Sequence, residues 1–379
     1  MTMPIGKTSG ATVPAGGRAR RRNGAESQPS TAITESEIDI ARRKSEHVEI
    51  VLRGDVSARS VTTGLEHVHF EHCAAPELDI DAIDLSTTFV GRRMRAPLIV
   101  SSMTGGHLHA HRINSAIAEA AQQCGIGFGV GSQRIALEGR GDGGLGRTLR
   151  KLAPSAPILA NCGAAQLRAR DGLDLARRAV DMIDADALIV HLNPLQEAVQ
   201  RGGDRDWRDI QAAIERTARQ LGKPLVVKEV GSGLSPALAR RLWSLGVGIL
   251  DVAGAGGTSW AAVEAARARC PQARLIAEAF RDWGIPTATA IADVRAAVPD
   301  AIVIASGGIR DGVDAAKAIR LGADIVGQAA RMLPAALEGA KTLAAHIDVM
   351  IEQLRIACFC TSSHDLSALR TAQLLRNAY

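Results

Sequence analysis

Apolar and polar positions follow a two-part repeat along most of the chain. From about residue 96 onward, short apolar runs that end in glycine-rich or polar turns alternate with Ala- and Arg-rich segments of helical period. The apolar runs predict eight β-strands, at residues 97–102, 126–130, 157–161, 187–191, 224–228, 247–253, 301–306 and 324–327.

The predicted strands are too apolar to have one face in water, which is typical of parallel strands buried on both sides. Eight strand–helix units in one chain predict a single (β/α)8 TIM barrel, with strands from about residue 96 to residue 329. An open doubly wound sheet is the alternative, but it needs a topological switch point and usually has fewer strands. The segments between the strands predict helices at 113–123, 173–183, 207–221, 236–245 and 313–321, an extra helix and loop within 263–297, and a long C-terminal helix.

The N-terminal region breaks this pattern. Residues 1–36 are rich in Gly, Ser, Thr, Pro and Ala without a hydrophobic period, so we predict a disordered basic leader there. Residues 37–52 predict a short helix that ends in an extended piece, and residues 37–379 are expected to form one domain.

The charge distribution argues against a nucleic-acid partner. The net charge is +5, but residues 1–35 carry five basic side chains against two glutamates, so most of the excess belongs to the leader. Only 3% of the residues are aromatic, which leaves few side chains for stacking on bases.

Composition also bears on location. The chain has no apolar run of the roughly 18 residues that a membrane helix needs, and no apolar segment typical of a secretory signal. The six cysteines form no C-x-x-C pair and suit a reducing compartment. We therefore expect a cytoplasmic protein without a membrane partner.

Polar residues and glycines gather where the predicted strands end, which is the catalytic rim of a TIM barrel. Gly307 and Gly308 follow the seventh strand and Gly327 ends the eighth, so backbone N–H groups there can approach a phosphate closely. Arg310 would add a guanidinium fork, and the following helix N-termini would add favourable partial charge. These turns predict a phosphate site.

Two further positions have candidate chemistry. Lys228 ends an apolar strand, so this buried cation needs either a carboxylate partner or an anionic ligand. Glu197 follows the fourth strand and could hold Mg²⁺ through a hard oxygen, although a surface glutamate is the simpler interpretation from spacing alone.

Clustered histidines are weaker candidates for a metal site. His67, His69, His72 and Cys73 share one segment, but the alternation in HVHFEH predicts a strand with histidines on one face. The histidines at 107, 109 and 111 lie in the loop after the first strand and fit a metal site no better. Cys358 and Cys360 are expected to pack inside the C-terminal region.

Eight motifs in order, over about three quarters of the chain, resemble type 2 isopentenyl-diphosphate isomerase, the flavin-dependent form. They are Arg43-Lys44-x-x-His47, SSMTGG (101–106), GSQR (131–134), AN (160–161), HLNPLQE (191–197), VVKEVG (226–231), AGAGGTSW (253–260) and SGGIR (306–310). The resemblance implies a TIM barrel that binds FMN and uses Mg²⁺ to hold the diphosphate of a prenyl substrate. It also implies that NADPH reduces the bound FMN. It also implies a homo-oligomer, tetrameric or octameric.

The resemblance further implies site residues. Positions that match flavin contacts are Ser101, Ser102, Met103, Thr104, Ser132, Asn161, Lys228, Thr258, Gly308, Ile309, Arg310, Ala329 and Ala330. Positions that match substrate contacts are Arg43, Lys44, Ser132, Gln133, Arg134 and Gln196, with Glu197 as the Mg²⁺ ligand. Catalytic roles are implied for Gln196 as a proton relay, His191 near the diphosphate, and Lys228 beside the flavin ring.

Other functions of the same fold remain open. An FMN-dependent α-hydroxy-acid oxidoreductase would share Lys228 and the SGGIR turn, but would need a histidine base just past the sixth strand, where residues 254–260 contain no titrating side chain. A nucleotide dehydrogenase would need a nucleophilic cysteine, for which Cys162 is the candidate. A non-catalytic flavoprotein, or a nucleic-acid binder using the leader, is the third alternative.

Overall fold

The predicted barrel is confirmed. The computed structural model describes residues 35–103, 110–138 and 144–375, so almost all of the leader predicted for residues 1–36 lies outside the described residues. Eight parallel strands close into one barrel in the order β10-β3-β4-β5-β6-β7-β8-β9. They are β3 (Leu98–Val100), β4 (Gly127–Gly129), β5 (Ile158–Gly163), β6 (Ala187–Leu192), β7 (Leu225–Glu229), β8 (Ile249–Asp251), β9 (Ile302–Ala305) and β10 (Ile325–Gln328).

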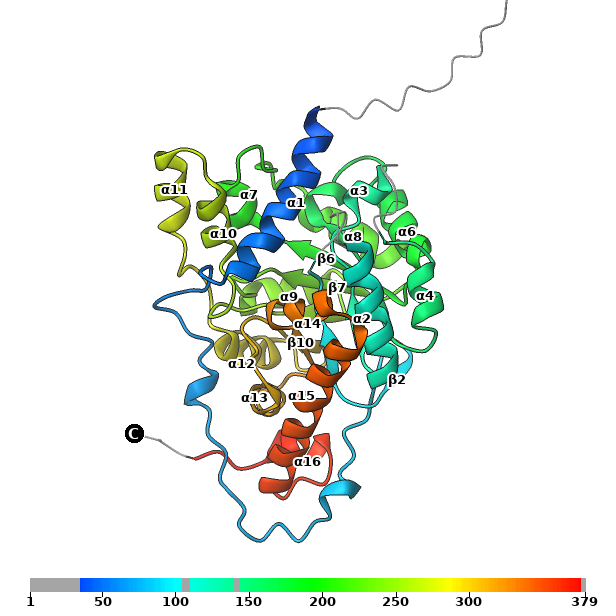
Figure 1. The fold of residues 1–379 in the computed structure, drawn as a ribbon, viewed down its shortest axis with the longest axis vertical. Coiled ribbons are helices and arrows are strands. Elements are labelled where there is room, and N and C mark those ends of the chain that lie inside the picture. Colours follow the sequence, from blue (N-terminus) through cyan, green and yellow to red (C-terminus); the bar gives the residue numbers. More distant parts are fainter. Residues whose placement is uncertain (1–34, 104–109, 139–143, 376–379) are drawn as a thin grey trace, which may run out of the picture.

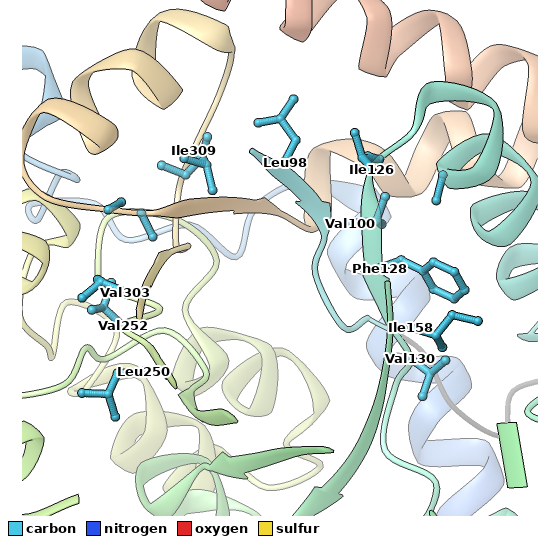
Figure 2. Packing of buried hydrophobic residues seen from close by; sticks show 14 of the residues in the cluster. Leu98, Val100, Ile126, Phe128, Val130, Ile158, Leu250, Val252, Val303 and Ile309 are labelled. Atoms are coloured by element: carbon cyan, nitrogen blue, oxygen red, sulfur yellow. The ribbon is translucent and has the colours of Figure 1, made fainter. Parts of the chain in front are cut away.

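The strands are apolar because both of their faces are buried. In β3, the side chains of Leu98 and Val100 pack outward against the helical layer, whereas Ile99 belongs to the cluster inside the barrel. Figure 2 shows the outer cluster, in which Ile158 lies beside Phe128 and Val130. The strands therefore have no wet face, as the apolar runs predicted.

Helices surround the strands (Figure 1). Each predicted helix is present, and the segment between β8 and β9 contains three helices, where one helix and one extra helix were expected. The larger helices after β3 are α2 (Ala110–Cys124), α6 (Gly172–Ile183), α8 (Ile210–Gln220), α9 (Pro236–Ser244), α10 (Trp260–Arg267), α11 (Pro271–Glu278), α12 (Thr287–Ala297), α13 (Gly312–Arg320) and α15 (Ala340–Cys360). Among the described helices, none has both the length and the apolar composition needed to span a bilayer.

A β-hairpin fills one end of the barrel. Strands β1 (Thr87–Phe89) and β2 (Arg92–Met94) pair antiparallel just before β3. Phe89 and Met94 are buried in the same cluster as Ile99 and the other inward-facing strand residues. This apolar plug leaves the opposite, carboxyl-terminal end of the strands for a ligand.

The segment between α1 and the hairpin runs around the outside of the barrel, along the left and lower edges of Figure 1. The strand predicted from HVHFEH is wrong. Leu65–His67 forms a short 3-10 turn, and Phe70 makes only an isolated antiparallel bridge to Leu374. The alternation instead reflects an extended chain with the histidine side chains in solvent, because its neighbour is a short stretch of the C-terminal tail and not a sheet.

Helix α1 (Glu35–Arg53) is longer than predicted and continues where an extended piece was expected. It lies beside α10, near the mouth of the barrel (Figure 1). Its position brings Arg43 and His47 to the cavity described below.

Candidate active site

A cavity of about 690 Å³ opens at the carboxyl ends of the barrel strands. Its wall contains most of the residues for which the sequence predicted a site. They are Arg43, Ser101, Ser102, Met103, Ser132, Arg134, Asn161, His191, Gln196, Glu197, Lys228, Thr258, Gly308, Ile309, Arg310, Ala329 and Ala330. A pocket of this size suits a cofactor together with a small substrate.

Two serine side chains in the cavity wall have buried hydroxyl groups. Ser101 Oγ and Ser102 Oγ are buried and have no hydrogen-bond partner among the described residues. Both sit against glycines: a Cβ on Gly327 would lie 2.3 Å from Ser101 Oγ, and a Cβ on Gly129 would lie 2.7 Å from Ser102 Oγ. Buried hydroxyls are rarely left unpaired, so these two indicate a polar ligand in the cavity.

Glycines pack tightly in the turn after β9 (residues 307–309), which is predicted to bind phosphate and is called the phosphate turn below. Gly307 and Gly308 have φ values of +97° and +71°, and a Cβ on Gly308 would lie 2.4 Å from Thr63 Cγ2. A Cβ on Gly257 would lie 2.5 Å from the backbone nitrogen of Gly308. Within the described part of the chain, the N–H groups of Gly308 and Ile309 have no acceptor, so they remain available to an anion.

Arg310 and the start of the following helix both have partners within the protein. The guanidinium of Arg310 donates from Nε and Nη2 to the Asp314 carboxylate, and these hydrogen bonds raise the pKa of Arg310. Arg310 still lines the cavity. At the start of α13, Gln353 Oε1 accepts from the N–H of Gly312 and Asp311 accepts from that of Asp314. The donors nearest the cavity are therefore those of the glycine turn and not those of the helix.

Lys228 is paired with a carboxylate that the sequence analysis missed. Its side chain is only 10% exposed, and Nζ lies 3.4 Å from Asp251 Oδ2. Nζ also donates to the Glu229 carbonyl and to Ser306 Oγ, while the Ser306 hydroxyl donates to Asp251 Oδ1 at 2.6 Å. The carboxylate partner expected for a buried cation is present, and Lys228 also lines the cavity.

His191 is oriented from behind by Asn161. The Asn161 amide donates from Nδ2 to the Val130 carbonyl, so its Oδ1 accepts from His191 Nδ1 at 2.8 Å. This arrangement assigns the proton of a neutral His191 to Nδ1, and Nε2 is then the acceptor. His191 thus enters the cavity wall with a defined tautomer.

Gln133 does not line the cavity, contrary to the substrate contact that the resemblance implied. It is 0% exposed, its Oε1 accepts from the Asn161 N–H, and its Nε2 donates to the Ala179 carbonyl. Its carboxamide is satisfied by backbone groups and has nothing left for a ligand. The side chain holds Asn161, which in turn orients His191.

Glu197 lies at the mouth with donors on both oxygens. Asn193 Nδ2 donates to Oε1, while Gln200 Nε2 and the Asp204 N–H donate to Oε2. These neutral donors hold the carboxylate in place without neutralising its charge. Burial lowers the pKa of nearby Arg43, and the charge of Glu197 opposes that shift.

A second missed carboxylate, Glu264 on α10, joins three elements beside the cavity. Its Oε1 lies 2.9 Å from His47 Nε2 on α1 and accepts from Gln196 Nε2 at 3.4 Å, while its Oε2 accepts from Arg267. Burial alone would raise the pKa of Glu264, but the hydrogen bond from His47 and the charge of Arg267 outweigh it and lower the pKa. Glu264 is therefore an anion in contact with Gln196.

Some predicted positions cannot be placed. Thr104 and the histidines at 107 and 109 lie outside the described residues, as does the side chain of Lys44. His111 is exposed, and the described residues contain no group of three His, Cys, Asp or Glu side chains that could hold a metal ion. Burial raises the pKa of the Cys162 thiol to about 12, so it is a poor nucleophile near neutral pH.

Comparison with known proteins first defines the class. The sequence pattern of the family described as FMN-dependent dehydrogenase matches residues 40–138 and 174–376. Among solved structures, a mandelate oxidase with an FMN adduct has a TM-score of 0.60 at 18% identity, covering 88% of this chain and 92% of that one. Another mandelate oxidase, with (S)-2-phenylpropionate, has a TM-score of 0.62 at 19% identity, covering 92% and 100%. These likenesses show the barrel fold of FMN-dependent dehydrogenases.

Curated relatives define the family more narrowly. An isopentenyl-diphosphate delta-isomerase of Stutzerimonas stutzeri is 60% identical over 341 residues, which are 90% of this chain and 99% of the relative. The enzymes of that name from Cronobacter sakazakii and Synechocystis sp. are 57% and 47% identical, covering 89% and 88% of this chain and 97% and 95% of the relatives. The chain therefore belongs to the isopentenyl-diphosphate delta-isomerase family, as the motifs indicated.

Proposed function

We propose that this chain interconverts isopentenyl diphosphate and dimethylallyl diphosphate by moving a proton from one end of the allylic system to the other, with FMN bound in the cavity. Family membership supports the reaction, since the relatives have this name. The observation that carries the proposal is the arrangement of the cavity, which has anion-binding N–H groups at one end, Lys228 at the strand ends, and Arg43 with Glu197 at the mouth. Such a cavity would bind the charged diphosphate of the substrate and its apolar alkene in different places.

The described residues fit FMN. The N–H groups of Gly308 and Ile309 would donate to its phosphate oxygens, and the hydroxyls of Ser101 and Ser102 would pair with its polar atoms. Lys228 keeps two of its three N–H groups on protein oxygens and remains at the cavity surface, where it would favour a negatively charged ring. Reduced FMN, when bound, supplies an electron-rich surface beside a developing carbocation.

The mouth of the cavity suits a diphosphate with Mg²⁺. Glu197 offers the only carboxylate of the predicted ligand set, so a magnesium ion there would complete its coordination with diphosphate oxygens and water. Arg43 and Arg134 line the same region and would bind the remaining phosphate oxygens. Anchoring the diphosphate in this way places the short alkene deeper in the cavity.

Proton movement is assigned to groups around the alkene. Gln196 donates to the Glu264 carboxylate and accepts from Asn193 at Oε1, so its amide is held on both sides. It would orient a proton donor or acceptor at the reacting carbon, while Glu264 sets the polarity of that amide. His191, which Asn161 holds at Nδ1, lines the cavity and would lie near the bound diphosphate.

Further parts of the proposal come from the family resemblance alone. NADPH would serve only to reduce FMN, since the isomerisation involves no net oxidation. A homo-oligomer, tetrameric or octameric, is also proposed from the resemblance, whereas the proposed cytoplasmic location rests on the composition of the chain.

The test is an anaerobic assay of the FMN-loaded chain with isopentenyl diphosphate, NADPH and Mg²⁺. We expect dimethylallyl diphosphate to form, and Glu197→Gln to raise the Mg²⁺ concentration for half-maximal rate at least tenfold without changing FMN affinity. Glu215→Gln is the control, because Glu215 pairs with Arg219 on the exposed surface of α8. Absence of the allylic product from the loaded wild-type chain would refute the proposal.

A further inference from the structure

The long C-terminal helix α15 reaches the barrel mouth through two side chains. His346 Nε2 lies 2.8 Å from Gln328 Oε1, and Gln353 Oε1 accepts from the Gly312 N–H at 2.8 Å. The two contacts fall on either side of the stretch from Ile309 to Asp311, which follows the phosphate turn. Neither residue was singled out by the sequence motifs.

Gln328, the last residue of β10, connects this helix to the turn. Its Nε2 donates to the carbonyls of Ile309 and Arg310, at 3.1 Å each. Because both amide hydrogens are used in this way, Oε1 must be the acceptor toward α15, and His346 Nε2 must carry the proton. The hydrogen bonds therefore run in one direction, from His346 through the Gln328 amide to the two carbonyls.

These bonds determine which backbone groups face an anion. A carbonyl oxygen turned toward the cavity would repel a phosphate, whereas Gln328 draws the oxygens of Ile309 and Arg310 toward itself. The preceding N–H groups, of Gly308 and Ile309, then stay without a protein acceptor among the described residues. Gly307 and Gly308 lie in the left-handed region, where glycine has wide conformational freedom, so the turn needs an external restraint.

Gln353 restrains the other side of the same stretch. A Cβ on Gly312 would lie 2.2 Å from the Met350 carbonyl, so α13 begins in direct contact with the backbone of α15. The N–H of Gly312 is taken by Gln353, so the start of α13 cannot rotate freely to offer this donor elsewhere. The loop from Ile309 to Gly312 is thereby held at both ends.

We propose that His346 and Gln328 are positioning residues for the phosphate of the bound cofactor, acting through the carbonyls of Ile309 and Arg310. This inference rests on the proposed function, in that it takes the ligand of the glycine turn to be the FMN phosphate. His346 touches neither substrate nor cofactor in this arrangement. It orients the Gln328 amide, and a reversed amide would turn an oxygen toward two carbonyl oxygens.

The first experiment measures FMN binding to the flavin-free chain by quenching of FMN fluorescence. We expect His346→Leu to raise the Kd about tenfold, equal to about 1.4 kcal/mol. His346→Gln, which keeps an N–H donor, should stay within about threefold of wild type, because Gln328 Oε1 can still accept a hydrogen bond from residue 346. Arg355→Met is the matched control, since Arg355 lies on the same helix but donates to the Ile83 carbonyl, away from the turn.

A second measurement is independent of FMN. Hydrogen exchange of the flavin-free chain should be faster at residues 308–312 in His346→Leu and in Gln328→Glu than in wild type or Arg355→Met. Gln328→Glu serves if His346→Leu does not fold, because a carboxylate keeps the side-chain size but cannot donate to the two carbonyls.

The outcomes separate the two proposals. A wild-type chain that does not bind FMN would refute the proposed function, and the exchange data would still decide on the positioning role. Unchanged exchange at residues 308–312 would overturn the inference. So would an equal FMN Kd in wild type and His346→Leu, whatever the catalytic rate.

Discussion

At the scale of single residues, the site depends on buried charges whose partners lie far away in the sequence. Lys228 and Asp251 are on adjacent strands and pair across the barrel wall, where Asp251 is 2% exposed. Such a pair contributes little net stability when intact, but removal of one member leaves a buried charge without compensation. The pair is therefore best tested by changing each member alone and then both together.

We predict that Lys228→Met lowers the free energy of unfolding by about 3 kcal/mol, because Asp251 loses its countercharge. Adding Asp251→Asn to that variant should restore a large part of the loss, since Asn keeps an oxygen for the Ser306 hydroxyl and has no charge. Urea denaturation of the flavin-free proteins measures the free energy of unfolding of the single and the double variant. A double variant no more stable than Lys228→Met would contradict the pairing.

Gly308 allows a second prediction. Gly308→Ala places a methyl group against Thr63 Cγ2 and the Gly257 backbone at a φ of +71°, so FMN affinity should fall at least tenfold. Gly222→Ala is the matched control, because Gly222 has a φ of +73° and open space around it. Equilibrium dialysis with FMN compares the two variants. Equal affinities would show that the turn does not hold the phosphate.

Several predicted site residues lie in the cavity wall because they are in the last part of a strand or directly after it. Ser101, Asn161 and Lys228 line the cavity because the ends of parallel strands converge there. Glu264 and Asp251 were missed because each is a single carboxylate in an apolar segment, and its partner lies on another element. The substrate contact of Gln133 was implied by the resemblance alone, and a motif cannot show that backbone groups already pair with its amide.

At the scale of elements, helix α1 depends on the segment around α11 for its position. Arg281 pairs with Glu278 and donates to the Asp55 and Ser57 carbonyls, just after α1. Next to it, the Asp282 carboxylate accepts from the N–H groups of Arg59 and Ser60, which lowers the pKa of Asp282. These contacts fasten the end of α1 while Glu264 holds its middle.

We predict that Asp282→Ala increases hydrogen exchange at Arg59 and Ser60 at least tenfold, since both amides lose their acceptor. Because this opening is local, the free energy of global unfolding should change little. The KM for isopentenyl diphosphate should rise, because Arg43 on α1 is less well held, while FMN affinity should not change. Asp206→Ala is the control, as Asp206 accepts from Arg208 in another loop. An unchanged KM would show that α1 is positioned by other contacts.

Strands were easier to predict than the connecting chain. The eight short apolar runs were predicted as strands because a parallel strand buried on both faces is apolar throughout. The predicted range 187–191 agrees with β6 (Ala187–Leu192) within one residue. The segment from 54 to 86 was harder, since its few backbone pairs are with the C-terminal tail and with loops. HVHFEH alternates there without forming a strand, because no sheet edge lies beside it.

At the scale of the whole molecule, the two ends of the barrel have different roles. The ligand cavity occupies the carboxyl end, while the β1–β2 hairpin closes the interior at the other. The segment of residues 54–86, outside the barrel, is held to the C-terminal tail by two backbone hydrogen bonds. They run from the Glu71 N–H to the Gln373 carbonyl and from the Leu375 N–H to the His69 carbonyl. The hydrogen bonds between this segment and the C-terminal tail should affect the stability of the fold and not the binding of a ligand.

Removal of residues 373–379 tests this division. It deletes both backbone hydrogen bonds and the bridge between Phe70 and Leu374, so we expect the free energy of unfolding to fall by about 1–3 kcal/mol. The Kd for FMN should stay within about twofold, a change of less than 0.5 kcal/mol at roughly 1.4 kcal/mol per tenfold. A large loss of FMN affinity would mean that the tail supports the cavity directly.

The central claim is that this barrel moves a proton on a prenyl diphosphate without net oxidation. The most direct measurement counts dimethylallyl diphosphate formed per bound FMN after a single reduction under anaerobic conditions, with the excess reductant removed. The account predicts many product molecules for each flavin and no further consumption of NADPH. Product limited to one molecule per reducing equivalent, or none at all, would contradict it.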